Sequence, residues 1–192
     1  MRVAIFGQAA FGADVFNALK DENVNIVGVS TPRAQNRPDP LQEAAESNEI
    51  PIIATPDLKN DAFFQEYLSW PPDLLVFAFV TDIVKKNVLD AAQYGAIQYH
   101  PSLLPLYRGR SAMNWPIING ATKTGISIFW VDEGIDTGPI LLQHEVDISY
   151  EESMGSLYFN KLYPLGVKSL VESVKMVGEG TAPRVEQIHE NA

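Results

Sequence analysis

The 192-residue chain contains no cysteine, which excludes disulfide bonds, thiolate metal sites and cysteine nucleophiles. It also lacks long apolar runs. The N-terminal segment has too few apolar residues for the hydrophobic region of a signal peptide. No other run approaches the roughly 18 apolar residues that a membrane-spanning helix needs. These absences predict a cytoplasmic protein without a membrane partner, since a reducing compartment suits a chain without disulfides.

Positive charge is scarce as well. The chain has 14 Lys and Arg against 24 Asp and Glu, which gives a net charge of −10. An acidic surface repels phosphate backbones, so the charge balance disfavours a nucleic acid as partner. The content of 46% hydrophobic and 20% charged residues is that of an ordinary globular protein that can bury a full core.

The first hundred residues alternate between apolar runs and amphipathic segments. Strands are predicted at 2–7, 24–30, 50–55, 73–80 and 96–100. Helices are predicted after Gly7 and at 38–48, 61–70 and 81–95, the last between an N-cap at Thr81 and a stop at Gly95. This alternation is typical of right-handed βαβ units on a parallel sheet.

The pattern changes after residue 100. A short helix is predicted at 111–120, followed by strands at 124–131 and 139–148 that a short loop joins, which favours antiparallel pairing. A helical region at 153–177 has a break or kink at Pro164. We therefore predict an α/β fold: a Rossmann-like, mostly parallel twisted sheet with flanking helices and an antiparallel C-terminal strand pair.

The glycine-containing turn at 7–12 is a weak signal for dinucleotide binding. It lacks the G-x-G-x-x-G spacing, and the second strand ends in Ser30 and Thr31, without an acidic residue for a ribose. Gly7 and Gly12 are therefore predicted to permit a tight turn and close packing. A dinucleotide oxidoreductase remains a disfavoured alternative.

His100 is one of only 3 histidines and stands at the predicted end of a strand, where open α/β sheets bind their ligands. Gln98 lies on the same side of that strand. Asp136 falls in a glycine-flanked turn between the antiparallel strands, and a carboxylate beside an imidazole orients it. The alternatives are that His100 only caps its strand by a hydrogen bond to the backbone, and that Asp136 belongs to a plain turn. A metal site is not predicted, because no second histidine is near, and Ser102 lacks the context of a nucleophile.

Two segments carry a family resemblance. "HPSLLPLYRG" at 100–109 and "SAMNWPIINGATKTGISIFWVDEGIDTGPILLQ" at 111–143 resemble the catalytic signature of the formyltransferases that use 10-formyltetrahydrofolate. This family includes methionyl-tRNA formyltransferase, glycinamide ribonucleotide formyltransferase and the hydrolase domain of 10-formyltetrahydrofolate dehydrogenase. His100 and Asp136 are 36 residues apart, as in the family.

The resemblance implies a catalytic trio of His100, Asp136 and Gln98, although the family has asparagine at the third position. It also implies a folate slot and an acceptor-side loop. The folate residues are Phe77, Ala78, Phe79, Val80, Trp130, Val131, Asp132, Glu133, Gly134 and Ile135. The acceptor-side residues are Ser102, Leu103, Leu104, Pro105 and Arg108.

The implied activity is transfer of a formyl group from 10-formyltetrahydrofolate, as co-substrate and without a metal, to an amine acceptor. The acceptor is open between methionyl-tRNA and a small amine. The alternatives are hydrolysis to formate and tetrahydrofolate, and a folate-binding module without catalysis. We expect the formyltransferase catalytic domain at 1–180 and a tail or linker at 181–192. The sequence leaves open the oligomeric state and whether a C-terminal domain follows.

Overall fold

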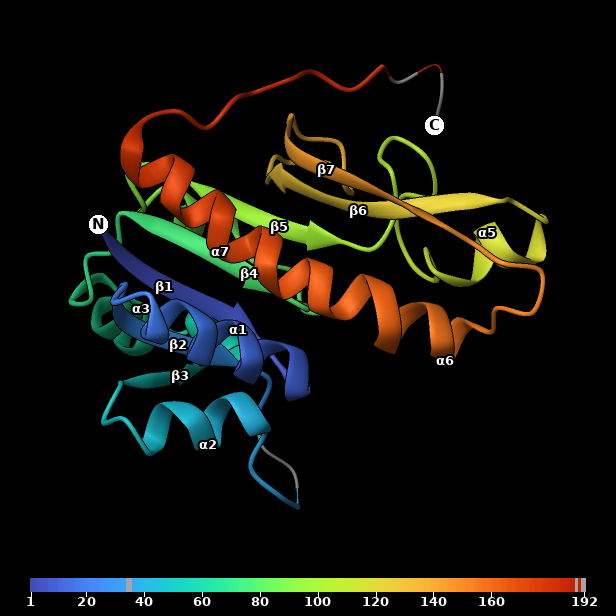
Figure 1. Ribbon diagram of the computed structural model, residues 1–192. Coiled ribbons are helices and arrows are strands. Elements are labelled where there is room, and N and C mark those ends of the chain that lie inside the picture. Colours follow the sequence, from blue (N-terminus) through green and yellow to red (C-terminus); the bar gives the residue numbers. More distant parts are fainter. Residues whose placement is uncertain (34–35, 189, 191–192) are drawn as a thin grey trace. The chain divides into compact units, whose positions relative to one another are not determined.

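The computed structural model describes residues 1–33, 36–188 and 190 (Figure 1). It comprises two compact units, Met1–Ile97 and Gln98–Ala192. In the described part of the chain, no helix has the length and the hydrophobicity that crossing a membrane requires.

The first unit is built on parallel strands. They are β1 (Arg2–Gly7), β2 (Asn25–Thr31), β3 (Ile52–Ala54) and β4 (Leu74–Ala78). Their order is β3-β2-β1-β4, and every neighbouring pair is parallel. Strand β4 is buried along its whole length, as expected for a central strand that is covered on both faces.

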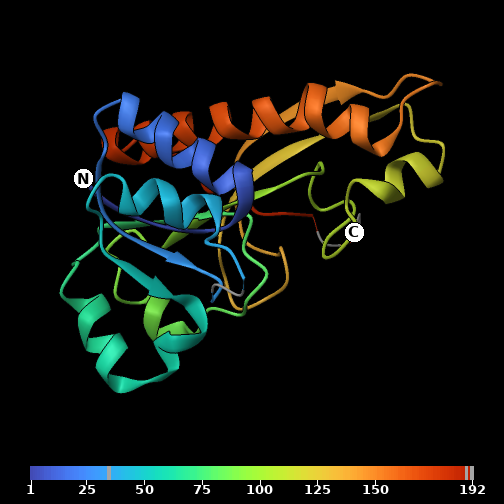
Figure 2. The same cartoon turned by 90° about the horizontal axis from the view of Figure 1, so that it is seen from below.

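The helices of the first unit pack on these strands. They are α1 (Ala9–Asp21), α2 (Pro40–Glu46), the 3-10 helix η1 (Thr55–Lys59), α3 (Asp61–Leu68) and α4 (Lys86–Leu89). Figure 2 shows α1 and α2 on one face of the strands and α3 on the other. The ring of Tyr67 on α3 meets that of Phe6 on β1 edge to face, with centroids 6.2 Å apart.

The helix predicted over 81–95 is wrong. Only the single turn α4 is helical, and its N-cap is Lys85 instead of Thr81. Ile83 is 91% exposed, and Val88 is the one buried residue of α4. Short helices depend on a packed apolar face, and this segment buries too little to extend the helix. The predicted stop is present, because Gly95 has a φ of 75°.

The second unit contains the strand order β5-β6-β7. Strand β5 (Ala96–His100) spans the boundary between the units, and β6 (Lys123–Trp130) and β7 (Ile140–Asp147) follow. The β6–β7 pair is antiparallel, with Ile126 opposite His144. Parallel strands followed by an antiparallel C-terminal pair, with flanking helices, confirm the predicted fold class.

The helices of the second unit are α5 (Asn114–Ile118), α6 (Met154–Leu157), the π-helical turn η2 (Tyr158–Leu162) and α7 (Tyr163–Glu179). Pro164 is the second residue of α7, directly after the helical turn η2, and it has no N–H to donate to that preceding turn. The irregularity predicted at Pro164 therefore takes the form of the π turn just before it. Gly180, with a φ of 71°, ends α7.

Candidate active site

The chain itself fills the position at which a dinucleotide would place its phosphates. The carboxylate of Asp39 accepts the N–H of Ala9 at 3.0 and 2.8 Å, and that of Leu41 at 2.9 Å. Ala9 opens α1, and the N-terminus of that helix is where an anion would bind. A β-carbon on Gly7 would lie 2.3 Å from the carbonyl oxygen of Ala78, so Gly7 permits close strand packing. Both findings agree with a structural role for this turn.

The structure brings His100 and Asp136 together within the second unit. Nδ1 of His100 lies 3.4 Å from Oδ2 of Asp136, and the two side chains are 6% and 10% exposed. His100 ends β5, and Asp136 lies in the β6–β7 loop with a φ of 53°. The same Oδ2 accepts the backbone N–H of Gly109 at 2.8 Å. The carboxylate is therefore held in a fixed position beside the imidazole.

The second ring nitrogen of His100 is also occupied. Nε2 lies 2.8 Å from the carbonyl oxygen of Tyr107. A carbonyl oxygen only accepts, so Nε2 carries a proton and donates. Nδ1 then faces Asp136, whose carboxylate also only accepts. A proton on Nδ1 would make this contact a charge-assisted one.

Two polar side chains, the buried Ser127 on β6 and the exposed Gln143 on β7, hold the loop that follows His100. Oγ of Ser127 donates to the carbonyl of Ser102 at 2.7 Å and accepts the N–H of Leu104 at 3.0 Å. Nε2 of Gln143 donates to the carbonyl of Leu104 and to Oγ of Ser127, both at 2.8 Å. Through this loop the strands fix the carbonyl of Tyr107. The sequence does carry a signal here, because Ser127 is the one polar residue in the run 126–130 of β6.

The β6–β7 loop is shaped by its own side chains. Oδ1 of Asp132 accepts the N–H of Gly134 at 3.0 Å and the hydroxyl of Thr137 at 2.7 Å. A β-carbon on Gly138 would lie 1.7 Å from the carbonyl oxygen of Trp130, so only glycine fits there. These constraints give the D-T-G turn its structural reason, and they place Asp136 at the tip.

The remaining predicted site residues lie in both units. Gln98 is half-buried, on the same face of β5 as His100, and its amide has no hydrogen-bond partner among the described residues. In the first unit, Phe77 and Ala78 are buried in β4, and Phe79 is 48% exposed with a φ of 65°; Val80 is half-buried. The joint role of the two groups of folate residues stays a prediction.

In the second unit, Trp130 is buried, Val131 half-buried, and Asp132, Glu133, Gly134 and Ile135 exposed. On the acceptor-side loop, Ser102 and Leu104 are buried, while Leu103, Pro105 and Arg108 are half-buried. The guanidinium of Arg108 donates to Oε1 of Gln187 from Nε at 3.1 Å and from Nη2 at 2.6 Å.

Sequence reasoning missed the segment after the last helix. Nε1 of Trp130 donates to the carbonyl of Pro183 at 2.8 Å. Nε2 of Gln187 donates to the backbone carbonyl of Asp136 at 2.9 Å. Residues 183–187, which fall in the expected tail or linker, therefore contact the loop of the candidate site. No local motif marks them, because these contacts are entirely tertiary.

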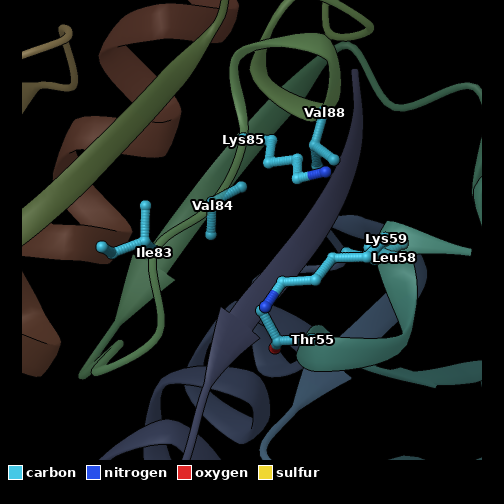
Figure 3. Close-up of a pocket in the computed structure, with 7 residues that line it drawn as sticks. All are labelled: Thr55, Leu58, Lys59, Ile83, Val84, Lys85 and Val88. Carbon is cyan, nitrogen blue, oxygen red and sulfur yellow. The ribbon is translucent and has the colours of Figure 1, made fainter.

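A small depression lies in the first unit, between η1 and the segment that leads into α4 (Figure 3). Residues Thr55, Leu58, Lys59, Ile83, Val84, Lys85 and Val88 line it. Its volume of about 10 Å³ holds no more than one water, and it contains no predicted site residue. Within residues 1–33, 36–188 and 190, no three carboxylate or histidine side chains gather as metal ligands.

A family model described as "Formyl transferase" matches residues 1–174. The chain therefore belongs to the formyl transferase family, which confirms the resemblance that the sequence motifs indicate.

Its curated relatives include the mitochondrial 10-formyltetrahydrofolate dehydrogenase of Homo sapiens. It is 39% identical over 200 residues, which cover 100% of this chain and 22% of the relative. The methionyl-tRNA formyltransferase of Clostridioides difficile (strain 630) is 34% identical over 197 residues, covering 99% of this chain and 63% of the relative. The chain thus spans about a fifth of the length of the dehydrogenases that it matches. Such dehydrogenases are named both mitochondrial and cytosolic, so the compartment stays a prediction.

Solved structures share the fold. The phosphoribosylglycinamide formyltransferase from Bacillus halodurans has a TM-score of 0.77 at 24% identity and covers 92% of this chain and 97% of its own. The N-formyltransferase from Helicobacter canadensis, solved with folinic acid and dTDP-3-aminofucose, has a TM-score of 0.77 at 20% identity. It covers 97% of this chain and 68% of its own.

Proposed function

We propose that the chain binds 10-formyltetrahydrofolate and transfers its formyl group to an amine, with His100 and Asp136 as the catalytic centre. The observation that carries the proposal is the buried pair of Nδ1 and Oδ2 at 3.4 Å, in a chain of the formyl transferase family. The curated relatives at 39% and 34% identity are named for 10-formyltetrahydrofolate or for formyl transfer.

The reaction needs donors for a developing negative charge. The amine nitrogen attacks the formyl carbon, and the carbonyl oxygen becomes an oxyanion before the bond to the folate nitrogen breaks. Preorganised hydrogen-bond donors stabilise such an oxyanion. His100 supplies one donor from Nδ1, which exchanges its 3.4 Å contact with Oδ2 of Asp136 for the oxyanion, because the carbonyl of Tyr107 occupies Nε2. The amide of Gln98, without a partner among the described residues, supplies the other.

The reaction also needs a proton relay. The attacking amine loses one proton, and the folate nitrogen gains one when it leaves, so the overall transfer is balanced. Asp136 is the group that moves this proton, because its carboxylate is buried beside the imidazole and held by the N–H of Gly109. Neither step requires a metal ion.

Hydrolysis is the second candidate, with water in place of the amine and formate as product. The similarity to 10-formyltetrahydrofolate dehydrogenases favours it, as does Gln98, whose amide is one methylene longer than the family's asparagine. The folate residues 77–80 and 130–135, and the acceptor-side loop, belong to this proposal as well. Amine acceptors range from methionyl-tRNA to small primary amines.

The test follows formyl release from 10-formyltetrahydrofolate by absorbance, with and without methionyl-tRNA, an amino sugar nucleotide or a simple primary amine. Release that requires one of these amines supports transfer, and release at the same rate without any amine supports hydrolysis. Folate binding without release identifies a non-catalytic module. A chain that neither binds the folate nor consumes it refutes the proposal.

A further inference from the structure

One buried side chain, Gln187, uses its whole amide to join two loops of the candidate site. It is 6% exposed. Its Nε2 donates to the backbone carbonyls of Asp136 at 2.9 Å and Gly138 at 2.7 Å. Its Oε1 accepts two hydrogen bonds from the guanidinium of Arg108, at 3.1 and 2.6 Å. A single side chain thus connects the Asp136 loop with the loop that follows His100.

The atoms next to these bonds are the ones that hold the catalytic pair. Arg108 lies between Tyr107, whose carbonyl contacts Nε2 of His100, and Gly109, whose N–H donates to Oδ2 of Asp136. Asp136 itself has a φ of 53°, in the left-handed region that residues other than glycine adopt less readily. Such a conformation persists only where its surroundings fix it, and Gln187 binds the carbonyl of that same residue.

Gln187 lies at the end of the segment 183–187, which is held by contacts with β6 and β7. The carbonyl of Pro183 accepts from Nε1 of Trp130 at 2.8 Å, and the guanidinium of Arg184 lies 3.7 Å from the centre of a Trp130 ring. Val185 and Ile140 exchange backbone hydrogen bonds at 2.8 and 3.0 Å. The segment is fixed on β7 before it reaches the site, so little backbone entropy is lost when the amide binds.

We propose that Gln187 is a positioning residue for the reaction, acting through the Asp136 carbonyl and through Arg108. This inference rests on the proposed function of the His100–Asp136 pair. In the described part of the chain, the hydrogen bonds of Gln187 go to Arg108 and to two backbone carbonyls, and not to the imidazole or the carboxylate. Its role is to keep Nδ1 and Oδ2 at their short separation while the proton moves.

The main test replaces Gln187 by leucine, which has a similar volume but no polar group. Glu186→Gln serves as the matched control, since it changes an exposed neighbour on the same segment. We expect Q187L to lower kcat by about 10²-fold, the effect of displacing catalytic groups by roughly 1 Å. KM for 10-formyltetrahydrofolate should change less than about threefold, because positioning affects the chemical step. Glu186→Gln should match the wild type.

A second variant distinguishes the acceptor Oε1 of the Gln187 amide from its donor Nε2. Gln187→Glu keeps an acceptor for Arg108 but points a carboxylate at two backbone carbonyls. We expect no rescue, because both donors are lost. Wild-type kcat in Gln187→Glu would overturn the role of the Asp136 carbonyl bond.

A measurement made without substrate tests the role of Gln187 independently of the proposed function. The ring ¹H–¹⁵N resonances of His100 in the full chain should shift in Q187L and stay unchanged in Glu186→Gln. If the wild type releases no formyl group, the proposed function fails while this measurement still tests the positioning. Unchanged resonances together with an unchanged kcat in folded Q187L would overturn the inference. If Q187L does not fold, Arg108→Lys carries the same test, since it breaks the bidentate contact to Oε1.

Discussion

Ser127→Ala tests how the strands hold the loop beside His100. Ser127 is fully buried on β6, and its Oγ takes part in three hydrogen bonds. Alanine keeps the β-carbon and leaves almost no cavity, so the change isolates the loss of the hydroxyl. If the account is right, both the stability and the activity of the protein depend on this one oxygen.

The magnitude follows from the partners that Ser127→Ala leaves behind. The carbonyl of Ser102 loses its donor, and the N–H of Leu104 loses its acceptor. Gln143 keeps the carbonyl of Leu104 as a partner. An orphaned buried polar group costs about 1–3 kcal/mol, so two such groups should lower the free energy of unfolding by about 2–6 kcal/mol.

Urea unfolding and steady-state kinetics measure the two effects of Ser127→Ala. We expect kcat to fall along with stability, because the released loop carries the carbonyl of Tyr107 that orients His100. Ser149→Ala is the control, since its exposed hydroxyl donates to the nearby Glu152. A loss below about 1 kcal/mol with unchanged kcat would refute the reasoning, because the hydrogen bonds would then contribute little.

Three further predictions concern the site and the core. Asp136→Asn should lower kcat by about 10²–10⁴-fold, because the proton relay is lost, while folate affinity measured by titration stays near that of the wild type. Gly138→Ala should unfold at lower urea and lose activity, since its β-carbon would lie 1.7 Å from the carbonyl oxygen of Trp130; a stable, active variant would contradict the geometry.

The third prediction concerns pH. Burial raises the pKa of Tyr67, whose hydroxyl donates to the carbonyl of Val88 at 2.8 Å. The unfolded chain then loses this proton near pH 10 while the native state retains it, so the free energy of unfolding falls as the pH rises above about 10. Tyr67→Phe should flatten that fall in pH-dependent urea titrations, and the fully exposed Tyr150→Phe should not.

The sequence predicts most of the fold because buried strands and helices require a local pattern of apolar residues. A strand covered on both faces must be apolar throughout, which identifies β4 and its neighbours. The helix predicted at 81–95 is wrong because its length depends on long-range packing, which leaves no local pattern. Capping and stop signals are local, whereas the exposure of Ile83 depends on what the rest of the chain offers for packing.

The residues of the candidate site also differ in whether the sequence reveals them. His100 and Asp136 can be found from the sequence because one ends a strand and the other lies in a short loop between neighbouring strands. Gln187 cannot, because it lies 51 residues from Asp136 and follows a helix with no motif of its own. Only the folded chain shows that this amide meets two loops of the site.

The most direct test of the central claim is single-turnover formyl release from 10-formyltetrahydrofolate by His100→Ala, with His144→Ala as the matched control on β7. The account predicts that His100→Ala loses about 10²–10³-fold in rate, the usual effect of removing one oxyanion donor, with folate binding retained. His144→Ala should release the formyl group at the wild-type rate. Equal rates for the two variants and the wild type would contradict the assignment of His100 to the reaction.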